Sequence, residues 1–159
     1  VASRRQLQRC RRDRNKIGVN TRAFIDGTGT QGIVADSVSL VATDTSAINA
    51  FAGAASLAVS VGGTVGGSVA IGISLAKNLI TSDVSAYILN AQSIVGDISL
   101  RASESASIKA VSAAAAIAAG FGGTVGVAIA GAGAEATNTI LTSTNAYVKD
   151  STLSDAGDS

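Results

Sequence analysis

The sequence contains no histidine, proline, methionine or tryptophan. Histidine is the commonest general acid–base and metal-binding side chain, so its absence argues against most hydrolytic and metal-dependent chemistry. Serine and threonine are abundant, but no histidine is present to activate one as a nucleophile. We therefore expect a protein that is not an enzyme and needs neither a cofactor nor a metal. The single cysteine, Cys10, excludes an intramolecular disulfide.

Charged residues are also scarce, at 14% of 159 residues, and they are unevenly placed. Residues 1–16 carry a net charge of +6, which leaves −5 on the rest of the chain. An arginine cluster favours anionic partners, but no aromatic residue is interleaved with it and no recognition motif follows. We therefore expect no nucleic-acid binding. With 47% hydrophobic residues, the body of the chain is too apolar to remain disordered.

The sequence contains an internal repeat. The block Val38-Ser39-Leu40 recurs as Ile98-Ser99-Leu100, an offset of 60 residues. At the same offset, the sequence Gly-Gly-Thr-Val-Gly of residues 62–66 recurs at 122–126, and Asn78 and Tyr87 recur as Asn138 and Tyr147. An earlier copy places Asn15 and Phe24 at an offset of 63. Several blocks at one offset indicate a repeat of about 60 residues.

The repeat divides the chain into two parts. Residues 15–159 form the end of one repeat, one whole repeat and most of another, so the chain resembles a piece of a longer protein. Residues 1–14 do not match the Gly/Ala/Val stretch that precedes Asn78 and Asn138. We predict that this basic segment lies outside the repeat, and disorder or an artefact are both open for it. An added tag, a shifted reading frame or a capping segment would each explain it.

Two uncharged stretches, residues 45–76 and 110–134, are long enough for transmembrane helices. In the first stretch, however, the large aliphatic residues from Leu57 to Leu75 all lie at odd positions, and small residues fill the even ones. A period of two indicates β-strands. We expect the aliphatic face to pack in a core. We also expect the strands to be interrupted at Gly62-Gly63 with Gly66-Gly67, and at Gly122-Gly123 with Gly126, because an uninterrupted strand of this length is rare.

The remaining segments also alternate, with turns expected at residues 90–92 and at Gly96-Asp97. Only residues 110–119 have a composition that would allow a helix. The sequence therefore predicts an all-β fold, either a β-solenoid or a stack of sheets built on the 60-residue repeat. The expected partners are flanking repeats of a longer chain, and exposed end strands favour self-association.

The three repeated blocks together, which are Gly-Gly-Thr-Val-Gly, Asn-x-Ile with Ala-(Tyr/Phe)-(Ile/Val), and Val/Ile-Ser-Leu-x-Ala, resemble long-period repeats of large bacterial surface proteins. Filamentous-haemagglutinin-like adhesins and leukotoxin-type β-strand-repeat proteins carry such repeats. The resemblance implies an extracellular or cell-surface structural segment that serves adhesion to a host-cell or matrix surface. Residues 68–72 are also similar to the head repeat of trimeric autotransporter adhesins, but that family repeats about every 14 residues and this chain does not.

Two groups of residues are candidate surface-binding positions. Asp44 and Glu104 are equivalent in the repeat, so adjacent strands would hold a pair of carboxylates that could bind a cation. An outward-facing polar position that resists edge aggregation is the favoured interpretation. Phe24, Tyr87 and Tyr147 share another repeat position and could form an aromatic ladder that binds sugars, although a structural stack is the favoured interpretation.

A membrane-inserting segment is the alternative function. It is built on the two uncharged stretches, which would insert as hairpins or helices, with the arginine cluster guiding the chain to anionic lipid. The period of two favours the structural segment over this alternative.

Overall fold

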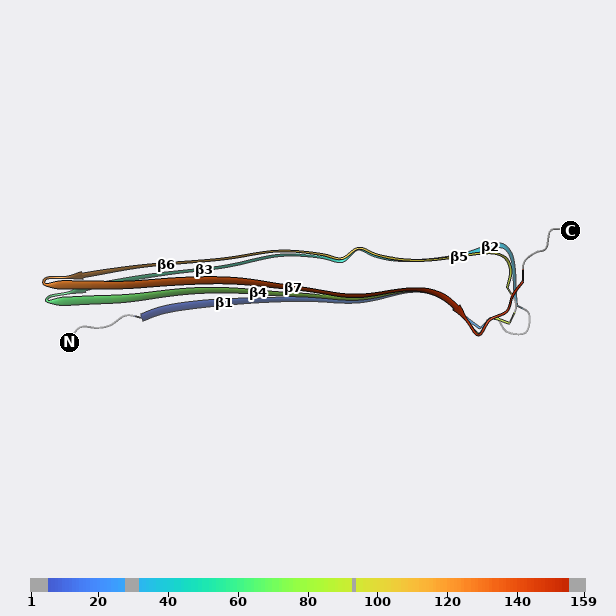
Figure 1. Ribbon diagram of the computed structural model, residues 1–159, viewed down its shortest axis with the longest axis horizontal. Helices are drawn as coiled ribbons and strands as arrows, with labels where there is room; N and C mark the ends of the chain where they lie inside the picture. Colours follow the sequence, from blue (N-terminus) through green and yellow to red (C-terminus); the bar gives the residue numbers. More distant parts are fainter. Residues whose placement is uncertain (1–5, 28–31, 93, 155–159) are drawn as a thin grey trace. The chain divides into compact units, whose positions relative to one another are not determined.

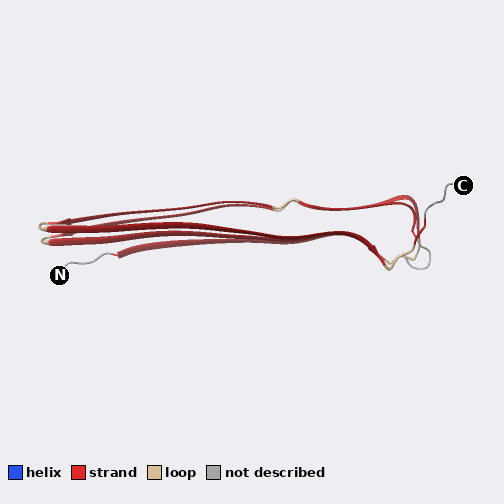
Figure 2. Ribbon diagram, in the orientation of Figure 1, coloured by secondary structure: helices blue, strands red, loops and turns tan. Residues whose placement is uncertain are grey.

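The computed structural model describes residues 6–27, 32–92 and 94–154, and it confirms the all-β prediction. Every element in the described part of the chain is a strand (Figure 2). The strands are β1 (Gln6–Asp26), β2 (Ile33–Asp44), β3 (Ala47–Gly62), β4 (Val65–Leu89), β5 (Ile94–Glu104), β6 (Ser107–Gly122), β7 (Val125–Lys149) and β8 (Leu153–Ser154). Among these described residues, there is no helix long and apolar enough to cross a membrane.

The strands form three parallel sheets with the orders β1-β4-β7, β2-β5-β8 and β3-β6 (Figure 1). Strands that follow each other in sequence lie in different sheets, so each strand pairs with its counterpart in another copy of the repeat. In the best-defined pairing, Ser39 of β2 lies beside Ser99 of β5 and Leu40 lies beside Leu100. Residues at equivalent positions of the repeat therefore neighbour each other across most of this ladder.

Contacts divide the chain into two compact units that cut across the long strands. Unit 1 contains Val1–Asn15, Ile48–Asn78 and Ile108–Thr139, and unit 2 contains Lys16–Ala47, Leu79–Ser107 and Ile140–Ser159. In unit 2, buried Val84 and Ile88 of β4 pack against Leu40 and Leu100 of the β2-β5-β8 sheet. This unit has a conventional aliphatic core.

Unit 1 buries the small-residue face of its strands, so the predicted aliphatic core is wrong there. Ala58 is 1% exposed and its neighbour Leu57 is 59% exposed. The buried face of β4 consists of Gly66, Ser68, Ala70, Gly72, Ser74 and Ala76. The two sheets approach so closely that a Cβ added to Gly72 would lie 2.5 Å from the carbonyl oxygen of Ala115 in β6. Only small residues fit such an interface.

The expected strand breaks are correct in one place and wrong in another. Turns at residues 63–64 and 123–124 separate β3 from β4 and β6 from β7. The breaks expected at Gly66-Gly67 and at Gly126 are absent, because β4 and β7 each continue through these glycines for 25 residues. The break at residues 90–92 is present, and Asn90 has a positive φ of 52°. Gly96 lies inside β5 at a φ of 117°, opposite a register shift in β2.

Two further expectations differ from the structure. Residues 110–119, whose composition would allow a helix, lie inside strand β6, where tertiary packing overrides the helix propensity of alanine. Strand β1 begins at Gln6, so described residues of the basic segment continue the β structure across the predicted boundary after residue 14. Residues 1–5 of the basic segment and residues 28–31 lie outside the described residues.

Candidate functional site

Three polar or aromatic rows and one apolar surface are the candidate functional features. The first row is aromatic and lies in unit 2, where Phe24 of β1, Tyr87 of β4 and Tyr147 of β7 occupy neighbouring strands. Their ring centroids are 5.2 Å apart in both pairs, and the rings are nearly parallel at 14° and 8°. This spacing follows from the separation of about 4.8 Å between adjacent strands.

The aromatic row is accessible at both ends. Phe24 is 53% exposed and Tyr147 is 41% exposed, while Tyr87 between them is half-buried. Ala86, next in sequence to Tyr87, points the opposite way into the core. The sequence position shared by the three rings therefore corresponds to a continuous stack, which offers aromatic faces and edges on the surface of unit 2.

The second row contains the two carboxylates at the ends of β2 and β5. Asp44 and Glu104 are direct register partners, so the structure brings them together as expected from the repeat. Asp44 does not face outward, which corrects the favoured interpretation of this position. Its carboxylate accepts hydrogen bonds from Ser82 Oγ of β4 at 2.5 Å and from Ser46 Oγ at 2.9 Å.

These hydrogen bonds change the acidity of Asp44. The hydroxyl of Ser82 stabilises the charged form and lowers the pKa of Asp44 below its usual 3.8, against the opposing effect of burial. Glu104 differs, because its Oε1 atom is buried without a hydrogen-bond partner among the described residues. In the described part of the chain, no group of three metal-ligating side chains includes this pair.

A third row, an asparagine ladder, was not singled out as a functional feature by sequence reasoning. Asn15 Nδ2 of β1 donates to Asn78 Oδ1 of β4 at 2.8 Å, and Asn78 Nδ2 donates to Asn138 Oδ1 of β7 at 2.9 Å. Asn78 is fully buried. The recurrence of asparagine at offsets of 63 and 60 residues was the available signal. The ladder aligns the three strands of its sheet and satisfies a buried amide.

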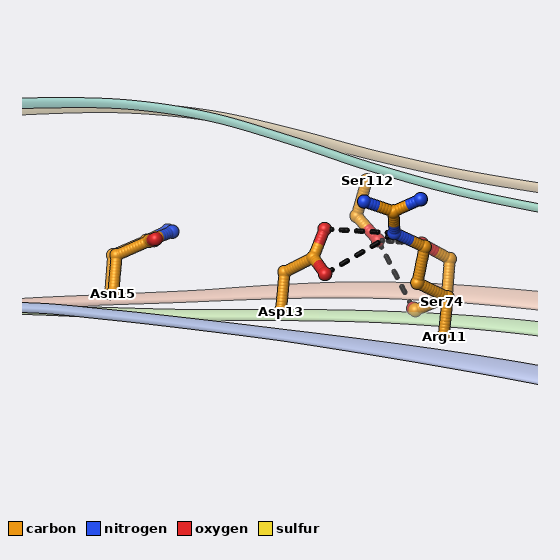
Figure 3. A network of polar contacts seen from close by, with 6 residues as sticks. Arg11, Asp13, Asn15, Ser74 and Ser112 are labelled. Atoms are coloured by element: carbon orange, nitrogen blue, oxygen red, sulfur yellow. Dashed lines mark hydrogen bonds and ion pairs between the residues drawn. The ribbon is translucent and has the colours of Figure 1, made fainter.

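Beside this ladder, unit 1 contains a small polar network (Figure 3). Arg11 and Asp13 of β1 form an ion pair with N–O distances of 3.1 and 3.2 Å. At the position of Arg11 along the strands, Ser112 Oγ of β6 donates to Ser74 Oγ of β4 at 3.0 Å. This serine pair bridges the two sheets of unit 1, so the small-residue interior is held by hydrogen bonds as well as by close packing.

The apolar surface of unit 1 was assigned to the core by sequence reasoning and is exposed in the structure. Its side chains belong to both sheets, and a cationic groove of about 350 Å³ lies in the same unit. The groove is lined by Arg12 and Arg14 of β1, Lys77 of β4 and Glu135 of β7, among others. Three cations and one carboxylate give this groove a net positive charge, which attracts anionic groups.

Comparison of the chain with protein-family models, with curated proteins and with solved structures found no match. The functional argument therefore depends on the geometry of the rows, the groove and the exposed faces.

Proposed function

We propose that the chain is a structural segment of a larger stacked β-repeat protein, a β-solenoid or stack of sheets in which each 60-residue unit covers the next. One observation carries this proposal. On β4, the small-residue face is covered by β6, with Gly72 against Ala115 and Ser74 bonded to Ser112. On β7, the corresponding small residues Ala128, Ala130, Ala132 and Ala134 are all exposed.

The bare face of β7 has the same chemistry as the covered face of β4. A further strand with small residues at alternate positions, as in β6, fits against it without a steric conflict. The outer edges of the sheets also carry unpaired backbone groups that can extend the ladder. Both features support stacking of flanking repeats, in register, on the units described here.

Sedimentation velocity of the full chain over a range of concentrations tests this proposal. We expect reversible assembly, because a second copy of the chain can supply the missing neighbour. Ala130→Glu places a charge on the bare face and should weaken assembly at least about tenfold, because the carboxylate would be buried without a partner. Far-ultraviolet circular dichroism checks that the variant keeps its strands.

Ile129→Glu is the matched control, since Ile129 is the next residue of β7 and points away from the bare face. It should leave assembly unchanged. If Ile129→Glu dissociates the oligomers and Ala130→Glu does not, the copies associate through the aliphatic surface and the stacking proposal is wrong.

The adhesive part of the function follows from the resemblance to bacterial surface repeats. We place the segment outside the cell or on a bacterial surface, where many copies of a weak contact would add up to firm attachment. The aromatic row is the surface that supports this role best, because its rings are rigid and accessible. Binding of the labelled chain to host cells should fall for Tyr147→Ala and stay unchanged for Leu141→Ala, an exposed residue of the same strand. Equal binding by both variants would exclude the aromatic row as the contact.

A further inference from the structure

The aliphatic outer surface of unit 1 is the largest feature that stacking does not explain. It lies on the outward sides of both sheets, where large apolar side chains occupy many of the odd-numbered positions. The exposed members are Phe51, Leu57, Val59, Val61, Val65 and Ile73 in β3 and β4, and Val111, Ile117, Phe121, Val125, Val127 and Ile129 in β6 and β7. Large contiguous apolar patches on a protein surface mark sites of interaction.

The length of this surface matches a lipid bilayer. From Phe51 to Val61, and again from Val65 to Ile73, the strands run without a charged residue. At roughly 3.3 Å per residue, the first run spans about 33 Å, close to the hydrocarbon thickness of about 30 Å. The turns at residues 63–64 and 123–124, where each pair of strands meets, are also uncharged.

Cations gather at the other end of the same surface. The Asn15–Asn78 hydrogen bond sets the register of β1 on β4, which places Arg12 beside Leu75 and Arg14 beside Lys77. All three cations line the groove where the aliphatic surface ends. In β6, the exposed Lys109 lies two residues before Val111, the first exposed aliphatic residue of that strand. An apolar surface followed by lysine and arginine is the arrangement that anionic membranes attract.

The interior of unit 1 agrees with a membrane environment. Small residues inside and large aliphatic residues outside are typical of proteins that pack in lipid, where close backbone approach replaces the hydrophobic effect as the source of cohesion. The two outer faces are on opposite sides of the two-layered unit. One further copy of the chain would cover one of them, whereas a bilayer covers both.

We propose that unit 1 inserts its turns and its aliphatic outer surface into the acyl chains of a lipid bilayer, with the cationic groove at the level of anionic headgroups. This inference uses the outward face of the strands, whereas stacking uses the inward face. It rests on the proposed stacking in one respect, because neighbouring copies must pair the backbone groups at the open sheet edges before the strands enter the hydrocarbon.

Flotation of the full chain with phosphatidylcholine vesicles, with and without phosphatidylglycerol, tests the proposal. The chain should float with both and bind the anionic vesicles more tightly. Leu57→Lys should weaken partitioning into neutral vesicles about tenfold or more, since a charge near the middle of the apolar surface must enter the hydrocarbon. The added lysine carries a positive charge, which can only strengthen electrostatic attraction to anionic vesicles. Weaker binding of Leu57→Lys therefore measures the loss of the apolar contribution.

Val41→Lys is the matched control, because Val41 lies on β2 in unit 2 and is 57% exposed, compared with 59% for Leu57. It should leave partitioning unchanged. Both side chains are exposed, so neither variant is expected to unfold the chain. Equal partitioning of Leu57→Lys and the parent chain would overturn the proposal.

Contact with acyl chains is measured directly by fluorescence quenching. The sequence has no tryptophan, so Leu57→Trp and Val41→Trp each introduce a single tryptophan reporter. Lipids with bromine on the acyl chain should quench the Leu57→Trp signal and leave the Val41→Trp signal unaffected. If the vesicles bind the chain without quenching Leu57→Trp, the attachment is electrostatic only and insertion is excluded.

The groove has its own test. Lys77→Gln should weaken binding to anionic vesicles about fivefold and leave binding to neutral vesicles unchanged. Lys149→Gln removes an exposed lysine of unit 2 and should change neither. Equal loss of anionic binding in both variants would show that net charge, and not the groove, attracts the lipid.

Discussion

Glycine and alanine determine how closely the two sheets of unit 1 approach each other. Gly66 is the clearest case, because a Cβ at this position would collide with the carbonyl group of Phe121 on the facing strand. Its neighbour Gly67 points outward into open space, with no atom within 4 Å of an added Cβ. Two adjacent glycines of one strand therefore have opposite steric surroundings.

We expect Gly66→Ala to lower the free energy of unfolding by about 1–3 kcal/mol, since overpacking displaces the backbone of β6. Gly67→Ala should be neutral or stabilising by about 0.4–1 kcal/mol, because alanine restricts the unfolded chain without a clash. Urea denaturation of both variants measures the difference. Equal free energies of unfolding would contradict the close approach of the sheets.

The Asp44 carboxylate makes stability depend on pH. Its pKa is lowered in the folded state, chiefly by the hydroxyl of Ser82, so the contribution is present above the ordinary pKa of 3.8 and is lost as the pH falls through the lower folded value. Ser82→Ala should lower stability at neutral pH by about 1–2 kcal/mol and reduce the loss on acidification. Urea denaturation from neutral pH downwards measures both.

Ser74→Ala is the control for this experiment. Ser74 is fully buried and bonded to Ser112, with no carboxylate among its hydrogen-bond partners. Its removal should lower stability without changing the pH dependence. An unchanged acid response in Ser82→Ala would show that Asp44 does not supply it.

At the scale of elements, side-chain ladders fix the register of the long strands. Register slips by one residue would exchange the two faces of a strand, so a specific signal is needed in each ladder. In the β1-β4-β7 sheet, the asparagines supply this signal in unit 1 and the stacked aromatic rings supply it in unit 2. Each ladder repeats one residue type on neighbouring strands.

Asn78→Ala should cost about 1–3 kcal/mol of unfolding free energy, because it removes two hydrogen bonds from the interior. Asn138→Ala removes only the bond that Asn138 accepts, and this residue is exposed, so the cost should be well under that of Asn78→Ala. Thermal unfolding of the two variants compares them. Similar midpoints would mean that the ladder does not act through its buried central member.

The alternation of β4 also explains which part of the fold was predictable. The period of two was sufficient to predict strands in place of membrane helices. It was not sufficient to choose the buried face, because the aliphatic residues change face along the strand. They are odd-numbered from Val65 to Leu75, whereas from Ile80 through Val84 to Ile88 the buried aliphatic residues are even-numbered, with Leu79 and Leu89 half-buried on the odd face. A continuous strand buries one face, and the core of unit 2 selects the even one.

The candidate residues were predictable to a similar extent. Equivalent positions in the repeat were sufficient to predict that Asp44 lies beside Glu104 and that Tyr87 stacks between Phe24 and Tyr147. The contact between Asp44 and Ser82 was not predictable, because these residues are 38 positions apart and the sequence does not show which sheets face each other. The cationic groove escaped prediction for the same reason, since it needs the register of β1 on β4.

At the scale of the whole molecule, the parallel sheets join residues that are far apart in sequence. The side-chain bonds of the asparagine ladder, for example, connect positions 63 and 60 residues apart. Pairing over such distances requires loop closure before any contact is gained, which slows folding. The chain contains no proline, so no slow step can come from proline isomerisation.

We therefore expect refolding from urea to be slow, on the scale of seconds or longer, and insensitive to a prolyl isomerase. Circular dichroism in the far ultraviolet follows the return of a β spectrum without helical features. Refolding within about a millisecond would contradict the long-range pairing of the strands.

The small-residue interior and the aliphatic exterior of unit 1 differ in how much sequence drift they allow. Between β3 and β6, interior positions exchange only glycine, alanine and serine, as in the pairs Ala52/Ser112, Ser56/Ala116, Ala58/Ala118 and Ser60/Gly120. Exterior positions change size and charge, as in Asn49/Lys109, Phe51/Val111 and Val61/Phe121. At these positions the interior constrains side-chain volume, and the exterior is free to diversify from copy to copy without altering the close approach of the sheets.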